Sequence, residues 1–443
     1  MNAIRLHRPF FSSAIVCTLT VGTGWGAYLL WQISEAGSFT AVSLHLINAH
    51  GHAQVFGWVG LFIMGFTLQI LPRFLQTKVW GPSLVDWVFG LMIVGILGRL
   101  VGGYYWDAAW GRLVGQFGSV SEIVAVALFV LIVVRTVRQS LSPVSVIELY
   151  ILASLFWLTV AVVFSAVHFA ITVGAPSRPA LLQQVATWQA PLRDVQIIGF
   201  ALVMILGVSQ RILPGVYRTE ATDSRKSLTV LILVNLAVLL AVVAHPVFIS
   251  TGSMLALVVR GAAGLLLFVS VAWLIIPWRL WRLPKPPDRS AKFISTAFGW
   301  LLASLTLTLL TPLYSGWSDM AFSHAYFGAA RHAITVGFVS QMILGVAARV
   351  VPFLQGLNAK DLPSLRSVYA LINVGCSLRV ILQIATDHAP AAFQLIAVSG
   401  LLELTAIAVW GVHLIRLMYS RPSPPFDSHR GISGGMRVRN KIV

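Results

Sequence analysis

Charged residues are scarce in this sequence. Asp, Glu, Lys and Arg make up 10% of its 443 residues, whereas soluble domains hold about 25%. Hydrophobic residues make up 57%, and they include 24 Phe and 15 Trp. A soluble protein of this length could not bury so much apolar side chain, so the composition excludes an ordinary soluble enzyme. It predicts an integral membrane protein whose principal partner is the lipid bilayer.

Cysteine and alternating apolar patterns are also rare. Cys17 and Cys376 both lie inside apolar runs, so no disulfide framework is expected. The short alternating segments of an outer-membrane barrel are absent. Instead, runs of roughly twenty apolar residues, each long enough to span a bilayer, lie near 12–33, 50–72, 83–106, 116–136, 146–174, 192–214, 228–250, 257–279, 291–314, 329–354, 366–386 and 391–418. We expect an all-α integral membrane protein of about twelve transmembrane helices, forming a single polytopic domain over 1–421.

Basic residues outnumber acidic ones, 31 to 14. With a cytoplasmic N-terminus, most of the Lys and Arg residues fall on the cytoplasmic side, as the positive-inside rule requires. We therefore expect cytoplasmic N- and C-termini, an inner (cytoplasmic) membrane location and no nucleic-acid partner. The basic tail over 422–443 is expected to be flexible. The arginines expected in outer loops are Arg112, Arg178, Arg193 and Arg331.

Three of the runs align without gaps, starting at His52, Asp194 and His332. They share Gly57/Gly199/Gly337, Gly65/Gly207/Gly345 and Pro72/Pro214/Pro352. Because the repeat recurs every ~140 residues, we expect three pseudo-repeated four-helix units, at about 12–136, 146–279 and 291–418. The shared glycines would serve either close helix packing or the close approach of a flat cofactor. Each shared proline is expected to end its helix where the chain reaches water.

Eight of the eleven histidines map to the outer third of the membrane or just beyond it: His45, His50, His52, His168, His245, His324, His332 and His388. Ionisable groups in spans are costly and usually face a site. Neutral imidazole suits haem iron and copper. We take His50, His52 and His332 as candidate cofactor ligands. The wider set of metal candidates adds His45, His168, His245 and His324.

His50 and His52 are two residues apart, so a regular helix would point them to different sides and they could not bind one metal together. His52 and His332 occupy equivalent repeat positions. His45 and His324 would share their helical faces if those helices extend far enough. For His388 the alternative is a solvated loop.

Arg99 and Arg379 occupy matching positions within spans and need anionic partners. Haem propionates would suit their fork geometry, so both are candidate cofactor-binding residues. The alternative partners are backbone carbonyls or the carboxylates of Asp107, Asp319 and Asp387.

Two acidic residues are notable. Asp194 replaces histidine in the middle repeat, where it would either orient a ligand imidazole or cap its helix. Glu403, near mid-membrane, would be either a proton relay or a hydrogen-bonded structural carboxyl.

Two stretches resemble the most recognisable parts of the NnrS family: RHAITVGFVSQMILGVAARV at 331–350, and His50-Gly51-His52 with FGWVGLFIMGF. The resemblance implies a haem- and copper-associated membrane protein linked to nitric oxide and nitrosative stress. It also implies a layout similar to the catalytic subunits of haem–copper oxidases and nitric oxide reductases. In that superfamily the haem ligands come from the second and tenth spans, which points to His50 or His52 with His332.

This sequence departs from the oxidase pattern. Its sixth span has Gln196 and Asp194 where the oxidases place a histidine, and its seventh span has only His245. A standard oxygen-reducing binuclear centre is therefore not expected. Gln54 also stands near the place where the NnrS pattern has an acidic residue, just after its two histidines.

The leading hypothesis is a haem- and copper-binding membrane protein that acts on nitric oxide or another small gas, or answers nitrosative stress. It allows for an oxidoreductase with a redox partner on the outer side, or for binding without turnover. One alternative is a cofactor-free polytopic transporter or metal-handling permease with a histidine-lined path. Another is a scaffold subunit of a respiratory complex.

Overall fold

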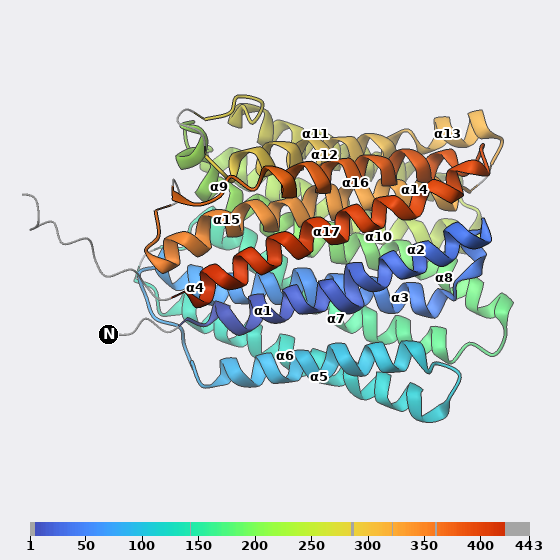
Figure 1. Cartoon of the computed structure of the whole chain (residues 1–443), viewed down its shortest axis with the longest axis horizontal. Coiled ribbons are helices and arrows are strands. Elements are labelled where there is room, and N and C mark those ends of the chain that lie inside the picture. Colours follow the sequence, from blue (N-terminus) through green and yellow to red (C-terminus); the bar gives the residue numbers. More distant parts are fainter. Residues whose placement is uncertain (1–4, 142, 285–287, 321, 359–360, 421–443) are drawn as a thin grey trace, which may run out of the picture.

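The computed structural model describes residues 5–141, 143–284, 288–320, 322–358 and 361–420. These residues form helices and connecting segments without a strand. Twelve helices are long and apolar enough to cross a membrane, and they run side by side along the long axis of the molecule (Figure 1). The prediction of an all-α protein with about twelve candidate spans is confirmed. The tail over 422–443 lies outside the described residues.

Nine spans are single helices or nearly so: α5 (Leu84–Tyr104), α6 (Ala109–Arg138), α7 (Val146–Val173), α10 (Ser224–Thr251), α11 (Met254–Ile275) with η5 (Ile276–Trp278), α12 (Ala291–Leu309), α16 (Arg366–Ala385), α17 (Ala391–Tyr419), and α1 (His7–Cys17) continued by η1 (Thr18–Gly22) and α2 (Thr23–Ala36). The other three are longer composites: α3 (Leu44–His52), η3 (Ala53–Gly60) and α4 (Leu61–Phe74); α8 (Arg178–Arg193), η4 (Asp194–Leu202) and α9 (Val203–Tyr217); and α14 (His324–His332), η6 (Ala333–Ser340) and α15 (Gln341–Gln355). Short helices η2 (Phe39–Ala41) and α13 (Thr311–Ser318) lie in connections.

Local sequence sets many helix ends. Ser145 and Glu148 form a capping box at the start of α7, and the Asp223 carboxylate caps α10. Gly252 and Gly356 take φ values of 66° and 67° and terminate α10 and α15, a conformation that glycine adopts without steric cost.

The shared prolines do not end their helices where the sequence suggested. Pro72, Pro214 and Pro352 lie inside α4, α9 and α15, which continue for two or three residues more. The physical reason is that each proline carbonyl accepts a closing hydrogen bond from the N–H group five residues on, which satisfies an orphan carbonyl of the last turn. The donors are Thr77, Thr219 and Leu357, at 2.9, 3.3 and 2.9 Å.

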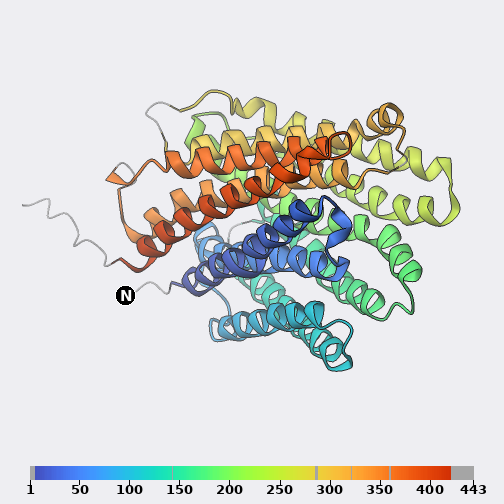
Figure 2. The ribbon, with the colours of Figure 1, turned by 45° about the vertical axis from the view of Figure 1, so that its right-hand side comes forward.

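The three composite spans form the centre of the bundle. The most apolar windows of Leu44–Phe74, Arg178–Tyr217 and His324–Gln355 are 89%, 78% and 72% buried, against 28–50% for the other nine spans. Both views place the cyan helices α5 and α6 at one edge, and Figure 1 places α11 and α12 at the opposite edge (Figures 1 and 2). Outward-facing apolar side chains such as Leu255, 73% exposed, suit a lipid surface.

The shared glycines serve helix packing. A Cβ atom on Gly207 would lie 2.5 Å from the Cβ of Tyr150, and one on Gly345 would lie 3.1 Å from the Cβ of Phe293. The same relation holds between Gly65 and Phe10, at 2.7 Å. Aromatic residues of the first helix in each predicted unit therefore pack directly on the central helix, as small residues permit in membranes.

The other shared glycines show the same pattern. Gly199 lies under Trp157 and Gly337 lies under Trp300. The two indoles donate to matched asparagines, Trp157 to Asn235 at 2.7 Å and Trp300 to Asn373 at 3.1 Å. These contacts agree with the alignment of the repeats.

We expect Gly207→Ala to lower thermal stability, because its new Cβ would overlap Tyr150. A cost of about 1–3 kcal/mol is typical of overpacking. Thermal unfolding in detergent would measure it. Gly299→Ala in α12 is the matched control, since nothing lies within 4 Å of a Cβ there. Equal melting temperatures for the two variants would contradict this packing role.

Candidate functional site

Three π-helical segments occupy matched places in the central helices. Segments η3 and η6 begin directly after His52 and His332, and η4 begins at Asp194. Segment η4 contacts both η3 and η6, so the three meet at the middle of the bundle. Such widened turns are often found at functional sites. We call the end of the bundle that holds these residues the histidine end.

The helices extend far enough to include the earlier histidines. Ser43 caps α3 and Ser323 caps α14, so His45 and His324 begin the same helices as His52 and His332. Their rings, however, have separate neighbours. The His45 ring stacks on Trp106 at 4.3 Å, and the exposed His324 contacts Phe39.

His52 lies in a closed polar network. Its Nε2 lies 2.8 Å from the Glu122 carboxylate and its Nδ1 lies 3.3 Å from the Ser165 hydroxyl. Arg99 donates to the same hydroxyl at 3.4 Å, and its guanidinium lies 3.9 Å from the centre of the Phe169 ring. We call His52, Arg99, Glu122 and Ser165 the first-unit network. Both ring nitrogens of His52 have partners within this network. Arg99 donates hydrogen bonds to the Ser119 and Ser165 hydroxyls and is attracted by Glu122, rather than by the aspartates considered from the sequence.

His50 and His332 differ from His52 because each keeps one ring nitrogen free. His50 Nδ1 lies 3.0 Å from the Gly22 carbonyl oxygen, and His332 Nδ1 lies 2.8 Å from that of Gly328. A carbonyl only accepts, so the proton is on Nδ1 and Nε2 keeps its lone pair in the neutral ring. Among the described residues neither Nε2 has a hydrogen-bond partner. A Cβ on Gly26 would lie 2.5 Å from His50 Cε1, so Gly26 makes room for that ring.

The two rings lie at the same end of the bundle, close enough for a charge on one to affect the other, and both lie within that range of the Arg379 guanidinium. We call His50 and His332 the histidine pair. Its members come from the second and tenth spans.

Arg379 and Glu403 form an incomplete cluster beside the histidine pair. They are 8% and 5% exposed and attract each other electrostatically. Within the described part of the chain, Arg379 Nε and Nη1, Glu403 Oε1 and Gln383 Oε1 are buried without a hydrogen-bond partner. Glu403 Oε1 therefore lacks the hydrogen bond that we considered for a structural carboxyl at this position. Asp387, considered as a partner of Arg379, accepts from Tyr314 and Ser323 instead.

Asp194 fills neither role considered for it. It lies inside a continuous helix rather than at its start, and it pairs with Arg260 at 3.4 Å. Arg260 also donates to the carbonyl of Ala241, the position that matches Arg99 and Arg379 in the repeat. In the middle unit the Asp194 carboxylate therefore pairs with Arg260.

The remaining candidates lie in other surroundings. His168 is buried, its Nε2 has no partner in the described structure, and its neighbours include Arg99 and Arg193. His245 Nε2 bonds to the Ala186 carbonyl at 2.9 Å. His388 contacts the Tyr314 hydroxyl. Over the described ranges, no three or more His, Cys, Asp or Glu side chains are arranged to hold a metal ion.

Glu122 was missed by the sequence reasoning. A usable signal exists, because it is a lone carboxylate in an apolar span, as Glu403 is. Both carboxylates lie against glycines at matched positions, Gly95 and Gly375, where a Cβ would collide with the Glu side chain. Arg193 and Arg331 were expected in outer loops but lie in α8 and α14.

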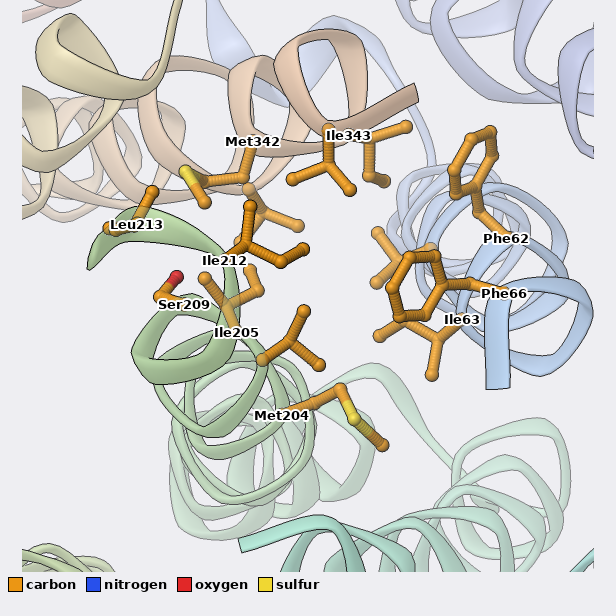
Figure 3. Close-up of a pocket in the computed structure, with 14 residues that line it drawn as sticks. Phe62, Ile63, Phe66, Met204, Ile205, Ser209, Ile212, Leu213, Met342 and Ile343 are labelled. Carbon is orange, nitrogen blue, oxygen red and sulfur yellow. The ribbon is translucent and has the colours of Figure 1, made fainter. Parts of the chain in front are cut away.

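An apolar cavity lies on the other side of the π segments from the histidines. It lies between α4, α9 and α15, is partly open, and is lined by side chains such as Phe62, Phe66, Met204 and Ile343 (Figure 3). Ser209 is its one polar lining residue, and its hydroxyl is buried without a partner in the described structure. His50, His332 and Arg379 are therefore not part of this cavity lining.

A family model described as NnrS protein matches residues 6–422, nearly the whole chain. The chain belongs to the NnrS family. The resemblance noted in the sequence is thereby confirmed, and the protein is a multi-pass membrane member of that family. No curated protein matches this NnrS chain.

We expect Glu122→Gln to destabilise this NnrS protein, because it removes the buried carboxylate charge that pairs with His52 and lies near the Arg99 guanidinium. Breaking one side of a buried pair costs about 3–5 kcal/mol. Chemical or thermal unfolding of the full chain would measure the loss. Glu35→Gln, at an exposed position of α2, is the control, and an equally small effect of both changes would argue against the first-unit network.

Proposed function

We propose that this NnrS protein binds haem between His50 and His332 and acts on nitric oxide or in the response to nitrosative stress, in the inner membrane. The observation that carries the proposal is the histidine pair. Two imidazoles at the same end of the bundle have Nδ1 fixed by backbone carbonyls and Nε2 left as a donor atom. Ligating histidines commonly donate their other ring N–H to a carbonyl in this way.

The donor set suits haem. Haem needs few protein ligands, and imidazole is a common one. When bound, haem would supply an iron atom that takes a small gas in exchange for one of its two imidazole ligands. The Gly22 and Gly328 carbonyls hold the tautomer and the direction of each ring, and Gly26 provides the space for His50.

The geometry favours His50 over His52 as the partner of His332. His52 would first have to leave Glu122 and Ser165. Removing it would also leave the buried Glu122 oxygen and the Ser165 hydroxyl without their His52 partner, which costs energy in a buried site. Copper binding and a redox partner on the outer side stay predictions. A second metal could take His168 as a ligand, because its Nε2 has no partner in the described structure.

The apolar cavity supports a neutral gas as the ligand. Nitric oxide is small and uncharged, and dry apolar cavities accept such molecules. The same cavity speaks against a transporter with a histidine-lined path, because an ion crossing between α4, α9 and α15 would meet apolar side chains and one hydroxyl.

Optical spectra of the purified protein test the proposal. We expect a Soret band that shifts on reduction and on addition of nitric oxide. His332→Ala and His50→Ala should each abolish or shift the band, because each removes a ligand. His52→Gln should keep the band while lowering stability, and His388→Gln should change neither.

Two results would contradict the proposal in different ways. A wild-type protein without a Soret band, even after haem is added, would rule out haem binding. A band lost in His52→Gln but kept in His50→Ala would instead assign the ligand to His52.

A further inference from the structure

Two arginines occupy matched positions beside the histidine pair. Arg331 directly precedes His332, and Arg193 directly precedes Asp194, the repeat position equivalent to His52 and His332. Both lie in helices and are half-buried at the histidine end. Each interacts electrostatically with the histidine pair, Arg193 with His50 and Arg331 with His332.

The first unit has Gly51 at this position, and its lack of a side chain has a steric reason. A Cβ on Gly51 would lie 2.7 Å from Nη2 of Arg193. The guanidinium of the second unit therefore occupies the space that a side chain of the first unit would take. Its Nη1 donates to Gln196 Oε1 at 2.6 Å, which fixes its direction.

The charges of these two arginines are not balanced by the protein. In the described parts of the chain no carboxylate lies within 4 Å of Arg193 or Arg331. Asp194 interacts with Arg331 but already pairs with Arg260. Arg193 is repelled by both Arg331 and Arg99.

The acidic groups that interact with the arginines at this end are few. Glu122 lies near Arg99, Glu403 lies near Arg379, and Asp194 lies near both Arg260 and Arg331. Arg193 is left without a carboxylate of its own. Unbalanced cations at membrane depth are expensive and call for an anion.

We propose that Arg193 and Arg331 form a binding site for a carboxylate or a small planar oxyanion next to the histidine pair. The planar guanidinium presents paired N–H groups that match both ligands. The carboxylates of a bound haem are one source, and this arm rests on the proposed function. A free oxyanion such as nitrite or nitrate is the other source, and that arm does not depend on haem.

The first arm compares haem with its dimethyl ester, which lacks the carboxylates. Haem affinity is measured by Soret titration of the full-length wild type, Arg193→Gln and Arg331→Gln. If the haem carboxylates occupy the site, each variant binds haem about tenfold or more weakly, while binding of the diester is unchanged. A variant that had merely lost structure would bind both compounds more weakly.

The second arm measures stabilisation by nitrite and nitrate. A ligand that binds the folded protein raises its melting temperature with concentration. If a free oxyanion occupies the site, the wild type shows this rise, and both arginine variants lose most of it. Arg178→Gln is the control in both arms, because Arg178 is an exposed arginine near the same end.

Gly51→Ala provides a test that keeps both charges. Its Cβ would displace the Arg193 guanidinium, so it should weaken the ligand identified in either arm as Arg193→Gln does. A difference between the wild type and these variants in one arm supports the proposal and identifies the source of the anion. Equal haem-to-diester ratios in all proteins, together with equal nitrite and nitrate shifts, would overturn it. A wild type that takes no haem would end the haem proposal and leave the oxyanion arm as the test of this one.

Discussion

The cost of burying charge in a medium of low polarity governs this molecule. Charged groups inside a bilayer must be paired, hydrated or bound to something else. Here His52, Arg99, Glu122, Arg379 and Glu403 are buried toward the histidine end, while α4, α9 and α15 line an apolar cavity. Helix packing holds these polar side chains in place. Some of them have hydrogen-bond and ion-pair partners within the described part of the protein, and others do not.

That difference separates the three units. His52, Glu122 and Arg99 satisfy one another in the first unit, and Asp194 takes Arg260 in the second. The third unit leaves atoms of Arg379 and Glu403 without partners, and His332 keeps a free nitrogen. The three central helices and their neighbours thus hold one closed network, one ion pair next to the unpaired Arg193, and one cluster whose polar atoms lack partners among the described residues. We expect a ligand to bind where buried polar atoms lack partners within the protein.

The sequence predicted the architecture well because span length and hydropathy leave few choices in a bilayer. All twelve predicted spans correspond to helices of the structure. The site was harder to predict. Whether His50 or His52 has a free nitrogen depends on Gly22 and Glu122, which are distant in the chain. Arg193 looked like a loop residue because the apolar run ends near it, while the helix continues back to Arg178.

The π segments have a consequence for how each central helix is assembled. An α-helix turns by about 100° per residue, so its two ends keep a fixed rotational relation. A π turn holds more residues and changes that relation. Segments η3, η4 and η6 lie between the histidine end and the cavity in all three helices. The residues that each helix faces at the histidine end are therefore set separately from those that it faces toward the cavity.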